Sequence, residues 1–377
     1  MIAMLRKHKY FIDYTLGIML RHKGKSLGLL TVYTLIIFLL ASVMLFSHAM
    51  RREAVTLLAN SPEIIVQRIQ AGRSVMLPAD YLQRIGNLRG VTEKRGRLWG
   101  YYYDPAVKAN YTIMASEQDH LSLNDIVIGA GIARTRGLAV GDYLTLRSYQ
   151  GKAFSFKVLK LLESESELIS SDLLLINSDA YRRLFGIDES LYTDLVLSVR
   201  NPREIQKIAE KLTLLLPDSR PILRDEILRT YESLFSWRQG VMLILLLGSV
   251  LAFVIFAWDK ASGLSAEERK EIGILKAVGW ETSEVMRMKF WEGAIISLVA
   301  FFCGYLAAYL HVFYTSAGLF EPVLKGWSVL YPSFQLTPSV DGLQLATLFF
   351  FTVLPYTLAT IVPVWRSSIT DPDLVMR

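Results

Sequence analysis

Four apolar runs divide this chain into membrane-like and polar parts. They lie near Leu27–Ser47, Val241–Trp258, Phe290–Val312 and Leu343–Trp365. Each has about 18–23 residues, the length that an α-helix needs to cross about 30 Å of hydrocarbon. The segment between the first two runs is long, polar and mixed in charge. The pattern therefore predicts one membrane helix, then a folded polar domain, then three more membrane helices.

The predicted fold class is a four-helix membrane protein with an α+β domain inserted between helices one and two. The stretch before the first run reads as an amphipathic helix at the membrane interface, although it could also be an extension of the first membrane helix. The predicted segments are an N-terminal helix over 1–26, membrane helices over 27–49, 240–259, 290–312 and 342–366, the α+β domain over 50–239, loops over 260–289 and 313–341, and a tail over 367–377.

Alternating and helical spacings predict the elements of the polar domain. Met50–Asn60 and Pro221–Gln239 are expected to be helical stalks that flank it, and Asn201 before Pro202 is a good helix N-cap. The other predicted helices are Pro78–Ile85, Asp179–Phe185 and Pro202–Leu216, and the predicted strands are Glu63–Gln70, Asp125–Ile128, Tyr143–Ser148, Phe154–Leu162, Leu173–Ile176 and Asp194–Val199.

Composition agrees with a protein that is half membrane and half polar. The 377 residues have a mean hydropathy of +0.32 with 20% charged residues and a net charge of +6. The basic residues cluster beside the apolar runs, which argues against nucleic-acid binding. The single cysteine, Cys303, excludes a disulfide within the chain. The first run lacks a small-x-small cleavage site after it, so we expect a retained membrane helix.

Positive charges predict the orientation. Lys and Arg are dense before the first run and between the second and third, whereas the loop between the third and fourth has only Lys325. Short loops rich in Lys and Arg lie on the cytoplasmic side. We therefore expect both termini and the 260–289 loop inside, and the α+β domain outside.

Several chemical motifs are incomplete. Gly129-Ala130-Gly131 lacks the third glycine of a dinucleotide fingerprint, since position 134 is Arg134, and Gly24-Lys25-Ser26 lacks the first glycine of a phosphate loop, since position 19 is Met19. The five histidines show no metal-ligand spacing, and no nucleophile-elbow motif is present. We expect no catalytic residue, no metal and no cofactor in this chain.

One short helix is predicted between the second and third runs. Ser265 and Glu268 form a capping-box pattern, Lys276 lies near the end, and Gly279 is expected to terminate the helix. Ile272, Leu275, Ala277 and Val278 are expected to give it an apolar surface. The segment could be a simple connection, or an element that receives force from a soluble partner.

This segment closely resembles the signature Arg/Lys-Glu-Ile-Gly-Ile-Leu-x-Ala-Leu-Gly of the FtsX/MacB/LolC family of ABC transporter permeases. The resemblance continues in Phe290–Ala294, in Gly304, in the ending Asp371–Arg377 with Met376 where leucine is usual, and in Asp125–Leu146, which is similar to the external domain of MacB- and LolC-like members.

The resemblance implies that the short helix is a coupling helix seated in a separate ABC ATPase, a homodimer that binds ATP and Mg²⁺. It also implies pairing with a second copy or a similar permease, contact with membrane lipids, and levers that move the external domain. A periplasmic adaptor or lipoprotein is a further expected partner, and the expected location is the bacterial inner membrane. The implied coupling residues are Glu267, Glu268, Arg269, Lys270, Glu271, Ile272, Gly273, Ile274, Leu275, Lys276, Ala277, Val278 and Gly279.

Glu292 stands where the family has a glutamate in the third membrane helix. It could be a packed structural residue or could couple movement to the loop. Two functions remain open: export or extraction of a lipophilic, lipoprotein or peptide-like substrate, and FtsX-like regulation of cell-wall hydrolases. The long external domain favours export.

Overall fold

The computed structural model describes residues 2–59, 61–116, 121–162, 167, 170–230, 244, 247–248, 251, 255, 266–321, 329–330 and 336–369. The chain divides into two compact units. Residues 1–49, 235–318 and 337–377 form a helical unit, and residues 50–234 and 319–336 form an α+β unit.

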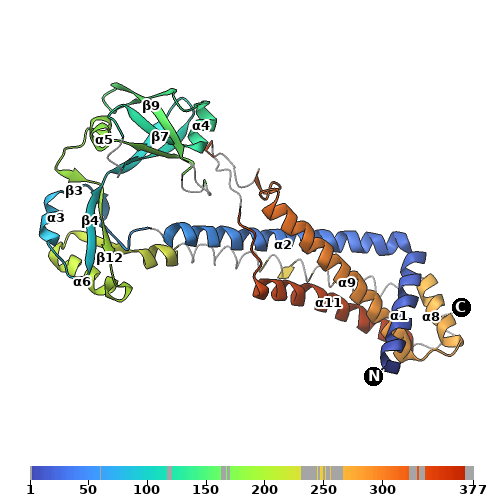
Figure 1. Ribbon diagram of the computed structural model, residues 1–377. Helices are drawn as coiled ribbons and strands as arrows, with labels where there is room; N and C mark the ends of the chain where they lie inside the picture. The colour runs from blue at the N-terminus through green and yellow to red at the C-terminus, as the bar shows by residue number, and fades with distance from the viewer. Residues whose placement is uncertain are drawn as a thin grey trace. The chain divides into compact units, whose positions relative to one another are not determined.

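The helical unit contains long apolar helices. In Figure 1, α9 and α11 run side by side. A turn at His22 separates α1 from α2, so the N-terminal stretch is a helix of its own and not an extension of the next one. The elements are α1 (Ile2–Arg21), α2 (Lys23–Ala59), α8 (Ala266–Ala277), α9 (Thr282–Phe313) and α11 (Gly342–Ile369).

Two helices of the described chain are long and apolar enough to cross a membrane, by length and composition. They are Ser26–Glu53 and Thr282–Phe313, and a shorter apolar stretch covers Gly342–Leu358. The predicted second crossing, 240–259, lies largely outside the described residues. The third predicted membrane helix, 290–312, starts later than the helix in the structure. Helix α9 already starts at Thr282, because Glu281 caps it before the apolar run begins.

A close contact holds α9 against α2. Along α2, residues at four-residue spacing are buried: Tyr33, Ile37, Ala41, Leu45 and Ala49. A Cβ at Gly304 of α9 would lie 2.8 Å from the Thr34 carbonyl oxygen and 2.9 Å from the Ile37 Cβ. A hydrogen at this position therefore lets the two backbones approach, as small residues do between membrane helices.

Polar side chains in this bundle are paired across helices. His311 Nδ1 of α9 lies 3.2 Å from Ser42 Oγ of α2. Ser297 Oγ lies 3.3 Å from Thr357 Oγ1 of α11. The Tyr33 hydroxyl donates to the Thr352 carbonyl. Because buried polar groups are costly when unpaired, these contacts fix the register of the helices.

The first sheet of the α+β unit has the order β13-β1-β12-β4, all antiparallel, with β2 added to β1. Its core includes Ile64, Leu195, Leu197, Ile208 and Leu212. Figure 1 shows α3 and α6 beside this sheet. Its elements are β1 (Ile64–Gln70), β2 (Arg73–Val75), α3 (Asp80–Ile85), β4 (Val91–Arg97), β12 (Asp194–Val199), η1 (Pro202–Glu204), α6 (Ile205–Leu215) and β13 (Ser219–Leu223).

The second sheet has the order β5-β6-β10-β7-β9-β8 and mixes parallel and antiparallel pairs. A small third sheet pairs β3 with β11. The elements are β3 (Leu77–Pro78), β5 (Trp99–Asp104), β6 (Ala109–Ala115), β7 (Asp125–Gly129), α4 (Ala130–Arg136), β8 (Tyr143–Arg147), β9 (Ala153–Leu162), β10 (Leu173–Ile176), α5 (Ser178–Phe185) and β11 (Leu191–Tyr192).

A buried ion pair joins the two larger sheets. Asp194 is 1% exposed and accepts two hydrogen bonds from Arg97, at 2.8 and 2.7 Å. It also accepts one from the Trp99 indole at 2.8 Å. Only Leu98 separates β4 from β5, so this carboxylate holds the chain where it passes from one sheet into the other. Three charge-assisted bonds satisfy the buried carboxylate, which would otherwise be strongly destabilising.

The Gly129-Ala130-Gly131 turn has a packing role. A Cβ at Gly129 would lie 1.9 Å from the Ser170 carbonyl oxygen, and one at Gly131 would lie 2.0 Å from Ser171 Oγ. The Ser171 carbonyl accepts the Ile132 amide at 3.1 Å, at the start of α4. The glycines thus admit a neighbouring backbone at the place where a nucleotide phosphate would have to lie.

The predicted strands and helices between Glu63 and Leu216 are present with small shifts in their ends, and Asn201 accepts a hydrogen bond from the Arg203 amide as a cap. Two expectations are wrong. Pro221–Leu223 is not helical but belongs to β13, because it pairs with β1. Strands β2, β3, β4, β5, β6 and β11 were not predicted; charged or glycine residues interrupt the apolar alternation of β4 and β5, and β2, β3 and β11 have only two or three residues.

We predict that Gly304→Leu separates α9 from α2. Overpacking of a close contact costs about 1–3 kcal/mol. The thermal unfolding midpoint of the full chain in detergent should fall, while Ala307→Leu, on an exposed position of the same helix, should leave it unchanged. Equal midpoints for both variants would contradict the close contact.

Asp218 holds the start of β13. Its carboxylate accepts hydrogen bonds from the Tyr81 hydroxyl at 2.8 Å and from Arg68 Nε at 2.7 Å. The Tyr81 hydroxyl, and then the Arg68 guanidinium, lower the pKa of Asp218. The pair is partly exposed, with 41% of the Asp218 side chain accessible. The ionised carboxylate therefore stabilises the fold by less than about 1 kcal/mol.

We predict that Asp218→Asn lowers the unfolding midpoint at neutral pH and not at acidic pH. The pKa of Asp218 is lower in the folded protein than in the unfolded chain, so its contribution is fully present above the unfolded value of about 4 and is lost as the pH falls from there through the lower folded value. Thermal unfolding at pH 7 and pH 3 measures this, with Asp225→Asn as the exposed control. The same loss at both pH values would show that charge is not the cause.

Candidate functional site

The candidate site is the short helix α8 with the turn that joins it to α9. All the implied coupling residues from Glu267 to Ala277 lie in α8, and Val278 and Gly279 form its end. The structure therefore brings them together on one element. The side chains of residues 266–271 and the predicted cap Ser265 lie outside the described part of the chain.

Gly279 ends α8, as predicted. It has a φ of +102°, a conformation that favours glycine. The Trp280 amide donates to the Leu275 carbonyl at 3.0 Å, and the Gly279 amide donates to the Lys276 carbonyl at 3.0 Å. This pair of bonds is a Schellman motif, which satisfies carbonyl groups that the helix leaves free at its end.

The next helix begins at once with its own cap. Glu281 is the N-cap of α9, and Glu281 and Glu284 form a reciprocal capping box. Ser283 Oγ also donates to the Glu281 carboxylate at 3.1 Å. Since the Schellman motif and the capping box are adjacent, the connection between α8 and α9 is short and hydrogen-bonded at both helix ends.

The exposed apolar surface of α8 differs from the expected one. Ile272 is 5% exposed and packs with Val285 and Trp280, so it does not belong to the surface. Ile274 and Val278 are instead 48% and 76% exposed, and Ala277 is also exposed. Positions 274, 277 and 278 share one face of a helix. This face is the surface that a partner protein could contact.

Glu292 lies apart from this face, on α9. Its carboxylate accepts a hydrogen bond from Lys289 Nζ at 2.6 Å, and the two side chains are 25% and 13% exposed. The residues are three apart on one helix and form an ion pair. Because the charge is already matched, the geometry favours a structural role for Glu292 over a coupling role.

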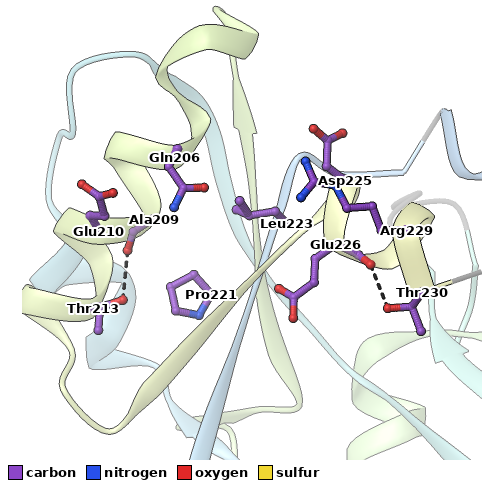
Figure 2. Close-up of a pocket in the computed structure, with 10 residues that line it drawn as sticks. All are labelled: Gln206, Ala209, Glu210, Thr213, Pro221, Leu223, Asp225, Glu226, Arg229 and Thr230. Carbon is purple, nitrogen blue, oxygen red and sulfur yellow. Dashed lines mark hydrogen bonds between the residues drawn. The ribbon is translucent and has the colours of Figure 1, made fainter. Parts of the chain in front are cut away.

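The α+β unit contains a separate open groove of about 570 Å³. Figure 2 shows that it lies between α6 and residues 224–230, with β13 beneath. Its charged residues are mostly acidic, and Glu226 is paired with Arg220 at 2.5 Å. The lining residues are Gln206, Ala209, Glu210, Thr213, Pro221, Leu223, Asp225, Glu226, Arg229 and Thr230.

Among the described residues no group of His, Cys, Asp and Glu side chains is arranged to hold a metal ion.

Sequence reasoning missed three features of these sites. The exposure of Ile274 depends on which face of α8 meets α9, which periodicity leaves open in so short a helix. The sequence did contain a signal for the capping box at Glu281, namely the pattern Glu-x-x-Glu two residues after a glycine. The groove joins α6 to residues beyond β13, and no local signal reports that contact.

Comparisons with known proteins show similarity in the region that contains α8. Residues 240–372 match the family model described as FtsX-like permease C-terminal. The chain is 25% identical over 185 residues to an uncharacterized ABC transporter permease of Methanocaldococcus jannaschii, an alignment that covers 46% of this chain and 44% of that protein. The chain thus spans less than half the length of this relative.

Two solved structures also resemble parts of the chain, each at 10% identity. The extracellular domain of the noncanonic ABC-type transporter YknZ from Gram-positive bacteria has a TM-score of 0.31, with 43% of this chain and 100% of that chain covered. The periplasmic region of MacB from Actinobacillus actinomycetemcomitans has a TM-score of 0.33, with 46% and 93% covered.

The matched region contains α8, α9 and α11. The chain therefore carries an FtsX-like permease domain in residues 240–372 and is a homologue of an ABC transporter permease.

Proposed function

We propose that this chain is the membrane subunit of an ABC transporter and that α8 docks on a separate ATPase. The observation that carries this proposal is the exposed apolar face of Ile274, Ala277 and Val278 on a helix rigidly joined to α9. Bare apolar side chains beside charged residues are typical of a surface that a partner covers. ATP and Mg²⁺ belong to the partner, and this chain has no catalytic role.

In this proposal the helices act as levers. ATP binding closes the ATPase dimer and moves α8, and the α8–α9 turn passes the movement to the bundle. Helix α2 is one uninterrupted helix from Lys23 to Ala59 and leads directly into the α+β unit. A continuous helix transmits displacement without a joint. Glu292, already paired with Lys289, supports the bundle.

The α+β unit lies outside the membrane in this arrangement, and both termini lie in the cytoplasm, as the positive charges favour. The protein pairs with a second copy or a similar permease in the cytoplasmic membrane, and an adaptor or lipoprotein can join it outside. We propose export or extraction of a lipophilic, lipoprotein or peptide-like substrate, because the α+β unit is long, covering residues 50–234 and 319–336. Activation of cell-wall hydrolases is the alternative.

We predict that a charge on the exposed face of α8 abolishes ATPase binding. Ile274→Asp and Val278→Asp should each weaken association about 30-fold or more, as for a central interface residue. Glu271→Lys should act in the same direction. The measurement is the amount of co-expressed ATPase that purifies with the full chain, and the ATP turnover of the complex in lipid nanodiscs.

Leu214→Asp is the matched control, because Leu214 is 81% exposed on the α+β unit. It should leave ATPase association unchanged. Gly273 is buried, so a bulky replacement there would also disturb packing and is a less selective test. Normal co-purification and turnover in the Ile274 and Val278 variants would overturn the docking assignment.

A further inference from the structure

Trp280 is the residue where three helices meet. It directly follows Gly279 at the end of α8, and its side chain packs with Ile272 of α8 and Val285 of α9. On its other side lies α1. The Phe11 ring meets the Trp280 ring edge-on, with centroids 5.9 Å apart and planes at 81°. The Tyr14 ring lies 5.3 Å away at 39°.

The face of α1 that carries these rings is also fixed to α9. Phe11 is 7% exposed and Thr15 is 1% exposed. The Thr15 hydroxyl lies 2.7 Å from the Phe11 carbonyl and 3.4 Å from the Met288 carbonyl of α9, so it reaches both. Met288 itself is 3% exposed. Helix α1 is therefore held at two points, Trp280 and Met288.

The opposite side of α1 is exposed. Leu16 is 40% exposed and Leu20 is 74% exposed on this side, where Asp13 is exposed as well. Lys9 precedes these residues and Arg21 ends the helix. Exposed apolar residues flanked by basic ones are the pattern of a helix that lies in the membrane interface. One side of α1 thus suits the bilayer surface, and the other side packs against the end of α8.

We propose that α1 is a positioning element for the coupling helix and that Trp280 is the residue it holds. Residues of α1 lie outside the region matched to the permease family, 240–372, so the match assigns them no part in coupling. The proposal rests on the proposed function, because positioning has meaning only if α8 receives force.

The physical reason is that α8 is short and is joined to its neighbour at one end only. Such a helix can tilt about the connecting turn, and this tilt would take up the displacement that an ATPase imposes on it. Aromatic contacts from α1 hold Trp280 from the side that α8 and α9 leave open. Helices α1, α8 and α9 then move as one body, so a displacement of α8 reaches the bundle.

The first experiment measures coupling in the full chain, co-expressed with its partner ABC ATPase and placed in lipid nanodiscs. Trp280→Leu and Tyr14→Leu should lower stimulated ATP turnover about 2- to 30-fold, the range for residues that modulate coupling. The amount of bound ATPase should stay constant. Trp280→Phe keeps a ring and should retain coupling, and Tyr10→Leu, at an exposed tyrosine one turn before Tyr14, is the matched control.

The second experiment tests the contact without an ATPase. In a Cys303→Ala background, Tyr14→Cys with Trp280→Cys should be joined by a short bismaleimide cross-linker. Leu16→Cys with Trp280→Cys should not, because residues 14 and 16 lie on opposite sides of a helix. Mass spectrometry of the linked peptides in native membranes gives the result.

The outcomes separate the two proposals. A wild-type chain that binds and stimulates no ATPase overturns the proposed function and with it the positioning role. Normal stimulation by Trp280→Leu and Tyr14→Leu, with wild-type stimulation intact, overturns the positioning role alone. Failure of residues 14 and 280 to cross-link also overturns it. Loss of stimulation with ATPase binding retained, together with the cross-link, supports it.

Discussion

The turn between α8 and α9 is the constraint on which the helical unit depends. A helix end leaves backbone groups without partners, and water normally satisfies them. Here the Trp280 and Gly279 amides close α8, and Glu281 and Glu284 open α9 within a few residues. These bonds keep the connection short, and the Phe11 and Tyr14 rings of α1 contact Trp280 within it. A short surface helix is thereby made continuous with a helix long and apolar enough to span a membrane.

Close packing carries the constraint from α9 into the rest of the bundle. Gly304 lets α9 touch the backbone of α2, and paired polar groups such as His311 and Ser42 fix the register of the two helices. Van der Waals contact and satisfied polar groups, rather than a hydrophobic core, hold helices together in lipid. The same reasoning explains why Glu292 is tolerated in α9, since Lys289 matches its charge three residues away.

The α+β unit is rigid for a different reason. Its two larger sheets each have an apolar core, and the buried Asp194 with Arg97 and Trp99 ties them where the chain crosses between them. Removing one partner of such a group would leave an unmatched buried charge.

The sequence by itself determined the apolar runs, the longer helices, about half of the strands, the end of α8 at Gly279, and the resemblance to a permease family, because these depend on local periodicity and on residues close in the chain. Tertiary structure alone decided which face of α8 is bare, that Ile272 is buried while Ile274 is exposed, that Phe11 and Tyr14 meet Trp280, and that Pro221 joins a sheet. Each of these depends on contacts between residues far apart in the chain. Local spacing carries no information about such contacts, so only the folded chain could show them.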